Sequence, residues 1–122
     1  MDKQLYVQKR HIQNENESES WVVLNSEHAI FKGHFPKNPI LPGVVLIDIF
    51  KKEAENYSQE KLLINHIKNV KFLKVVKVEE ETSLKLLTIF KTSENKLHLF
   101  GKAFDAQNNL VAKLQLELTS FE

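Results

Sequence analysis

The sequence predicts an α+β fold in which an antiparallel β-sheet wraps around one long central α-helix. The segment 43–57 begins wholly apolar and becomes charged, which indicates a helix that is buried at its start and solvated at its end. Near the end of the chain, Leu114, Leu116 and Leu118 alternate with polar residues, the period-2 pattern of a sheet with one dry and one wet face. At 122 residues, the chain is expected to form a single domain, 1–122.

The remaining strands are predicted from β-branched and aromatic residues between polar stretches. Segments 6–12 and 21–24 are expected to form two strands around a polar turn at 14–20. Further along the chain, apolar density predicts strands within four more segments: 62–78, 83–91, 97–106 and 110–119.

Composition excludes several classes of function. Lysine and arginine number 17 against 16 acidic residues, so no overall field indicates nucleic acid or an anionic membrane as partner. The absence of cysteine excludes disulfides, thiolate zinc sites and cysteine nucleophiles. The N-terminus lacks the apolar core of a signal peptide, and no apolar stretch approaches the length of a membrane span. A cytoplasmic location is therefore expected.

The segment 33–43 holds all three prolines and two of the three glycines of the chain. Prolines fix their own φ and bias the preceding residue toward extended geometry, so we expect a stiff, non-helical loop. This loop carries His34, and the apolar run that follows it is interrupted by a single acid, Asp48. An imidazole on a rigid loop and a carboxyl on a buried helix are suited to proton transfer.

Each of these features also has a structural interpretation. The three-residue spacing of the prolines fits a polyproline II ligand, and a lone histidine in a loop is often a hydrogen-bonded structural group. A metal site is not indicated, because the other four histidines show no ligand spacing with His34. The apolar neighbours of Asp48 predict a buried carboxyl with a raised pKa, either functional or held as a structural acid.

Gly43 is expected just inside the start of the helix. The first N–H groups of a helix lack internal partners and lie at the positive end of its dipole, so those of Gly43 and Val44 could hold a developing oxyanion. Alternatively, Gly43 simply permits a tight junction between loop and helix.

Taken as a whole, segment 33–48 resembles the signature of the 3-hydroxyacyl-acyl-carrier-protein dehydratases of the hotdog fold, the FabZ and FabA type. That signature is a histidine followed by Phe-Pro, then Pro-x-x-Pro-Gly-Val, with an acid fourteen residues after the histidine, and His34 and Asp48 have this spacing. The resemblance implies that His34 removes the α-proton of a 3-hydroxyacyl thioester while Asp48 protonates the departing hydroxyl. It also implies that the N–H of Gly43, helped by that of Val44, polarises the thioester carbonyl.

The same resemblance implies no metal or redox cofactor, and a substrate carried on the phosphopantetheine arm of an acyl carrier protein. It implies a homodimer or multiple of dimers, with His34 and Asp48 meeting across the interface, or a heterodimer with a paralogue. The acyl tunnel is expected to be lined by Phe35, Leu41, Leu46 and Phe50. Lysines in the segment 61–77, which has no acidic residue, are expected to attract the acidic carrier, with these candidates: Lys37, Lys71 and Lys74.

The chain departs from the family pattern at several points. Lys52 stands where a glutamine is usual, bulky residues follow the acid at 49–51, and the segment 77–81 replaces a Pro-rich, Gly-Asp turn. A divergent member serving a dedicated pathway is therefore expected. A hotdog thioesterase, or a non-catalytic acyl-binding subunit that pairs with an active paralogue, are the alternatives.

Overall fold

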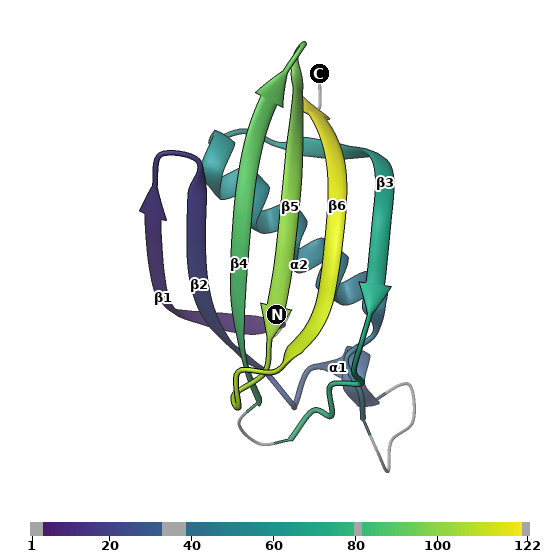
Figure 1. Ribbon diagram of the computed structural model, residues 1–122. Coiled ribbons are helices and arrows are strands. Elements are labelled where there is room, and N and C mark those ends of the chain that lie inside the picture. Colours follow the sequence, from purple (N-terminus) through teal and green to yellow (C-terminus); the bar gives the residue numbers. More distant parts are fainter. Residues whose placement is uncertain (1–3, 33–38, 80–81, 121–122) are drawn as a thin grey trace.

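The computed structural model describes residues 4–32, 39–79 and 82–120. One long helix and six strands dominate the described chain, and Figure 1 shows the helix α2 lying across one face of the sheet. In chain order the elements are β1 (Tyr6–Asn14), β2 (Glu17–Leu24), α1 (Ala29–Lys32), α2 (Gly43–Ser58), β3 (Leu62–Phe72), β4 (Thr82–Ser93), β5 (Lys96–Phe104) and β6 (Leu110–Ser120). The predicted α+β fold is confirmed.

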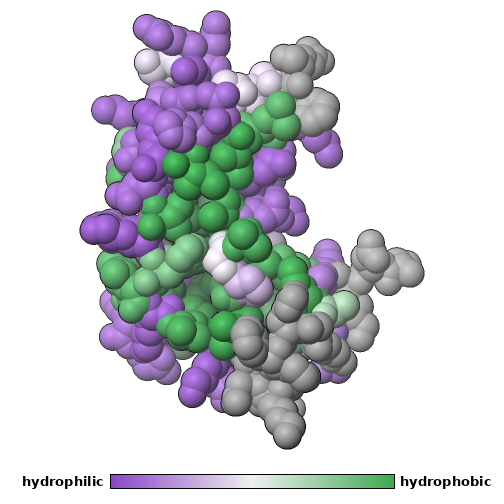
Figure 2. Space-filling view, turned by 90° about the vertical axis from the view of Figure 1, so that its right-hand side faces the viewer, coloured by the Kyte–Doolittle hydropathy of each residue, from purple (hydrophilic) through white to green (hydrophobic). Residues whose placement is uncertain are grey.

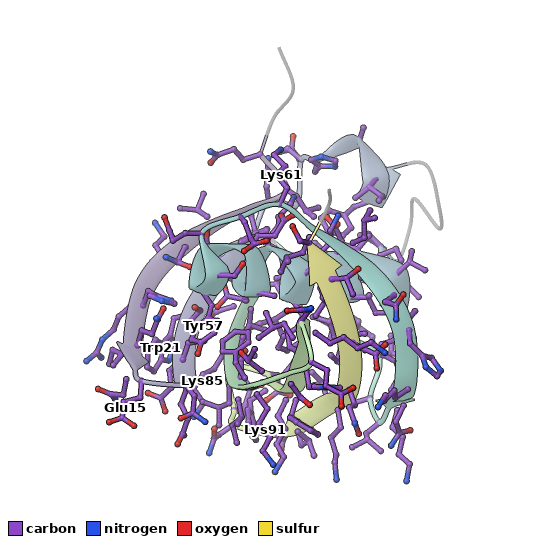
Figure 3. The ribbon with its side chains drawn as sticks, turned by 90° about the horizontal axis from the view of Figure 1, so that it is seen from above. Glu15, Trp21, Tyr57, Lys61, Lys85 and Lys91 are labelled. Atoms are coloured by element: carbon purple, nitrogen blue, oxygen red, sulfur yellow. The ribbon has the colours of Figure 1, made fainter. Side chains whose placement is uncertain are left out.

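The six strands form one sheet in the order β1-β2-β4-β5-β6-β3, and every neighbouring pair is antiparallel. Strands β1 and β3 are therefore the two edges of this sheet. Seen from above, the sheet curves around α2 (Figure 3). One face of the sheet packs on the helix, and the opposite face, here called the outer face, points away from it.

The first hairpin corrects the prediction of a long polar turn at 14–20. Strands β1 and β2 run through most of that segment, and only Glu15 and Asn16 form the turn, with Glu15 at φ 38°. Within β2, Ser18 and Ser20 are buried beneath α2 while Glu17 points to solvent. Small polar residues thus occupy the inward positions of a regular strand, so hydropathy alone did not identify it.

The core lies between α2 and the inner face of the sheet. Helix residues Ile49, Phe50 and Ala54 are fully buried there. The ring of Phe50 packs where a Cβ on Gly101 would stand 2.7 Å from it, so β5 needs glycine at this position. No helix in the described part of the chain is long and apolar enough to cross a membrane.

The described end of the proline loop is extended and fixed to the chain before β4. Leu41 N donates to Val76 O at 2.8 Å, and Val78 N donates to Pro39 O at 2.9 Å. Pro42 then caps α2 with extended backbone angles of φ −66° and ψ 144°. Residues 39–42 are thus non-helical, as predicted, and this segment fixes where α2 begins.

Candidate active site at the start of helix α2

The first turn of α2 presents backbone N–H donors that have no partner among the described residues, and it lies beside an apolar pocket. Gly43 and Val44 are the first two residues of the helix, so their N–H groups have no partner within it. Pro42 supplies no side-chain cap, although its carbonyl accepts from Val45 N at 3.1 Å. This end of the helix can therefore hydrogen-bond an oxygen that carries negative charge.

A pocket of about 300 Å³ opens against this turn. The loop and α2 contribute Leu41, Gly43 and Leu46 to its wall, and β3 contributes Phe72. Its remaining lining includes aliphatic residues from the segment after β3 and from β6, such as Val75, Val76 and Val111. The pocket is thus suited to an apolar group whose polar end reaches the start of α2.

Gly43 is favoured here by its close contact with Phe72 and not by an unusual backbone conformation. None of the described glycines has a positive φ. A Cβ on Gly43 would lie 2.5 Å from Cζ of Phe72, much closer than atoms can approach. Of the two explanations offered for this glycine, a tight junction and an oxyanion donor, the packing supports the first and leaves the second open.

Asp48 is not buried in the single chain, contrary to the sequence expectation. Half of its side chain is exposed, and its Oδ2 lies 3.4 Å from Nζ of Lys52, one turn further along. The buried side of α2 carries Ile49, Phe50 and Glu53, and Asp48 lies on the opposite side. Apolar sequence neighbours did not imply burial, because neighbouring residues in a helix point in different directions.

Only some of the residues predicted for the acyl tunnel lie on the pocket, and the predicted base is not among the described residues. Leu41 and Leu46 lie on the pocket, whereas Phe50 is buried against Gly101 and does not line it. His34 and Phe35, with the docking candidate Lys37, lie outside the described residues. The geometry between His34 and Asp48 therefore stays a prediction.

The two described docking lysines differ from each other. Lys74 is held by an ion pair of 3.0 Å to Asp105, in the connection between β5 and β6. Lys71, near the end of β3, is exposed on the outer face and pairs in register with Lys113 of β6. Only Lys71 presents an uncompensated charge, and its neighbour Lys113 was not identified from the sequence.

Sequence reasoning also missed a buried acid, Glu53, because the later part of the segment 43–57 was expected to be solvated. Glu53 is only 2% exposed, and its Oε1 accepts from Ser20 Oγ at 2.5 Å. Ser20 Oγ lies 2.7 Å from Nδ1 of His11, so a line of hydrogen bonds leads from the exposed imidazole to the carboxyl. Placing Glu53 on the helical stripe of Ile49 and Phe50 would have revealed its burial.

Burial raises the pKa of Glu53, and the hydrogen bond from Ser20 and the charge of His11 oppose that effect. Its Oε2 has no hydrogen-bond partner among the described residues. Burial also raises the pKa of Tyr6 to about 12, with further contributions from Glu53 and Asp48. In both groups burial disfavours the charged form. Among the described residues no group of three histidine or acidic side chains could hold a metal ion.

Comparison with known proteins shows which family this chain resembles. A family model described as "ApeI-like: ApeI dehydratase" matches residues 9–115. Two curated relatives are 3-hydroxyacyl-[acyl-carrier-protein] dehydratases FabZ. The one from Levilactobacillus brevis is 37% identical over 70 residues, 52% of this chain and 46% of the relative. The one from Lactiplantibacillus plantarum is 33% identical over 72 residues, 51% of this chain and 49% of the relative. The chain thus spans about half the length of these relatives.

Solved structures confirm the hotdog fold. The dehydratase heterocomplex ApeI:P from Xenorhabdus doucetiae matches with a TM-score of 0.74 at 21% identity, covering 93% of this chain and 96% of that one. A hypothetical thioesterase from Streptococcus pneumoniae with coenzyme A matches with a TM-score of 0.70 at 8% identity, covering 94% and 84%. The family match over most of the sequence is decisive, and this chain belongs to the ApeI-like dehydratase family as a divergent, FabZ-like member with a hotdog fold.

Proposed function

We propose that the protein removes water from 3-hydroxyacyl thioesters carried on the phosphopantetheine arm of an acyl carrier protein, giving trans-2-enoyl thioesters. The observation that carries this proposal is the apolar pocket against the first N–H groups of α2, those of Gly43 and Val44, in a member of a dehydratase family. Such a pocket suits an acyl thioester whose carbonyl oxygen points at the start of α2.

In the proposed reaction, His34 takes a proton from C2 of the substrate, and the N–H of Gly43, with that of Val44, stabilises the charge that develops on the thioester oxygen. The C3–O bond then breaks, and Asp48 gives its proton to the departing hydroxyl, which leaves as water. The electron pair of the broken C2–H bond forms the C2=C3 double bond. His34 ends protonated and Asp48 ionised, so one proton must return from His34 to Asp48 before the next turnover.

A second subunit is part of the proposal, because Asp48 must hold a proton to act as an acid. In the single chain half of the Asp48 side chain is exposed, and its Oδ2 lies 3.4 Å from the ammonium of Lys52. A partner that covers this side of α2 would take Asp48 out of solvent, and burial disfavours the charged form of a carboxyl group. Lys52 stands where the family usually has a glutamine, and it would then have to move away from Asp48.

The sheet edge formed by β3 offers the surface for such a partner. Figure 2 looks onto this side and shows a continuous apolar surface. Its exposed large apolar residues, from α2, β3 and the segment after β3, are Val44, Leu63, Ile67, Phe72, Leu73 and Val75. An apolar edge strand with free backbone groups favours pairing with another chain. The partner is either a second copy or, by analogy with the ApeI:P heterocomplex of Xenorhabdus doucetiae, a different subunit.

A thioesterase is the second candidate, favoured by the fold shared with the Streptococcus pneumoniae thioesterase. The two activities differ in their products. Dehydration preserves the thioester and lowers the substrate mass by one water, whereas hydrolysis releases a free thiol. A non-catalytic subunit would do neither when purified alone and would raise the activity of its paralogue.

The test is to incubate the purified protein with a carrier-bound 3-hydroxyacyl thioester and follow the enoyl product by mass spectrometry. His34→Ala and Asp48→Asn should each lower turnover about 10²- to 10⁴-fold, the range expected for a general acid or base. Glu60→Gln removes a different exposed carboxylate and should leave turnover unchanged. Near wild-type turnover in the Asp48 variant would remove that residue from the mechanism.

A further inference from the structure

The outer face of the sheet brings together three lysines from three strands. Lys102 of β5 lies in register with Lys113 of β6, and Lys113 lies in register with Lys71 of β3. Side chains that face each other in this way are about 5 Å apart at Cβ, and like charges so placed destabilise a sheet. We call these three residues the lysine row.

The lysine row contrasts with four lysines of the described chain that form ion pairs: Lys52, Lys68, Lys74 and Lys96. Within residues 4–32, 39–79 and 82–120, no ion pair involves any member of the row. No described residue compensates these three charges, so the three ammonium groups repel one another.

The row borders a groove of about 470 Å³ that crosses the outer face. Its apolar part is formed by Leu87, Ile89 and Phe100, and the last two are exposed. Lys102 and Lys113 line the groove on the β5–β6 side, and Glu17 and Glu19 line it on the β2 side. The groove thus combines an exposed apolar surface with a charge of opposite sign at each end.

The row also lies close to the candidate active site. Lys71 directly precedes Phe72, and Lys113 directly follows Ala112. Phe72 and Ala112 line the pocket at the start of α2. A partner bound to Lys71 and Lys113 would therefore contact the immediate sequence neighbours of two residues that line the proposed acyl site.

We propose that the outer groove and its lysine row form the docking surface for an acidic protein that presents an amphipathic segment. Carboxylates of the partner pair with Lys71, Lys102 and Lys113, and its apolar side chains cover Ile89 and Phe100. Glu17 and Glu19 repel the acidic end, which fixes the direction in which the segment lies. This inference rests on the proposed function for the identity of the partner, an acidic acyl carrier protein.

The test measures binding of the carrier without an acyl group, by titration calorimetry, so that its outcome does not depend on catalysis. The charge-reversal variant Lys102→Glu/Lys113→Glu should weaken binding at least 10-fold. The matched control Lys61→Glu/Lys91→Glu makes the same change in net charge at two exposed lysines outside the groove, and should change binding less than 2-fold. Figure 3 labels both control residues. Wild-type binding should weaken steeply as salt rises from 0.1 M to 1 M and the screening length falls from about 10 Å to about 3 Å.

Turnover of a small 3-hydroxyacyl thioester without a carrier should be the same in the groove variant and the wild type. Equal weakening of carrier binding by both double variants would show that only net charge matters, and no weakening by either would show that the carrier does not dock here; either result overturns the proposal. The proposal is also overturned if the Lys102→Glu/Lys113→Glu variant has half the particle mass of the wild type, because the outer face would then bind a second copy of the chain. If the wild type binds carrier through the groove but leaves the small thioester unchanged, the proposed function fails and the docking surface stands.

Discussion

At the residue scale, Glu53 is an acid buried in the core, and its Oε2 has no hydrogen-bond partner in the part of the chain that the structure describes. Since its pKa is raised in the folded protein, its ionisation is easier in the unfolded chain. Its contribution to stability is therefore fully present below the unfolded pKa, about 4.3, and is lost as pH rises through the higher folded pKa. We expect Glu53→Gln, which keeps an acceptor for Ser20, to raise the melting temperature at pH 8 but not at pH 4.

Thermal unfolding across pH measures this effect, with about 4 °C expected per kcal/mol in a chain of this size. Glu60→Gln, at an exposed position, should show no pH-dependent difference from the wild type. A Glu53 variant that is less stable than the wild type at every pH would show that the carboxylate itself is needed, as a partner of His11 through Ser20.

Gly101 and Gly43 differ in how easily the aromatic ring beside each of them could move to make room for a Cβ. A Cβ on Gly101 would lie 2.7 Å from the fully buried ring of Phe50, which has no room to move. A Cβ on Gly43 would meet the exposed ring of Phe72, which can turn away. We expect Gly101→Ala to lower the free energy of unfolding by about 1–3 kcal/mol and Gly43→Ala to lower it by less.

Because Phe72 lines the pocket, Gly43→Ala should instead reshape the proposed acyl site and lower kcat/KM. Denaturant titration and turnover, measured on both variants, separate the two effects. Loss of activity without loss of stability in the Gly43 variant is the expected pattern. A Gly43 variant with unchanged kinetics would show that the pocket is not used.

At the scale of elements, Asp105 organises the connection between β5 and β6. Its Oδ1 accepts from the N–H groups of Gln107 and Asn109 at 3.0 and 2.8 Å, and its Oδ2 accepts from Lys74 Nζ at 3.0 Å. These bonds, first of all those from Asn109 and Lys74, lower the pKa of Asp105 to about 2. The connection is thereby tied to the segment that follows β3.

A group with a lowered folded pKa stabilises the protein above its unfolded pKa, and this stabilisation is lost as pH falls through the folded value. Asp105→Ala should therefore destabilise the protein at pH 7 and much less at pH 2. Denaturant titrations at the two pH values measure the difference between variant and wild type. A difference that does not shrink toward pH 2 would mean that the charge of Asp105 contributes nothing.

At the scale of the whole molecule, the two sheet edges differ in surface. The edge at β3 carries Ile67 and Phe72 within a continuous apolar surface, whereas β1 has one exposed large apolar residue, Val7, among the described residues. We expect Ile67→Glu to halve the mass of the particle in light scattering. Val7→Glu adds the same charge at the opposite edge and should leave the mass unchanged.

This experiment also bears on catalysis, because the proposed site needs a partner to cover Asp48. Dissociation by Ile67→Glu should abolish dehydration even though Ile67 lies outside the candidate site. A monomeric variant with full activity would contradict the two-subunit site. If the wild type is itself a monomer with no activity, the paralogue pairing becomes the favoured form of the proposal.

The sequence alone determined the central helix, the last strand and the family resemblance. Helix α2 was predicted at 43–57 and spans Gly43–Ser58, and the last strand was predicted at 110–119 and spans Leu110–Ser120. These features follow from local signals, namely proline at the start of a helix and side chains that alternate along a strand. The motif around His34 and Asp48 likewise resembles that of the dehydratases, and the family match over residues 9–115 confirms this resemblance.

Only the tertiary structure decided which side chains are buried and which lie together. It placed Asp48 on the exposed side of α2 and Glu53 beneath it, the reverse of what their sequence neighbours suggested. It brought Lys71, Lys102 and Lys113 into one row from strands far apart in the chain. The physical reason is that burial of a helical residue depends on which side of the helix faces the sheet. Which residues lie side by side on different strands depends on register and strand order. A short segment of sequence determines neither.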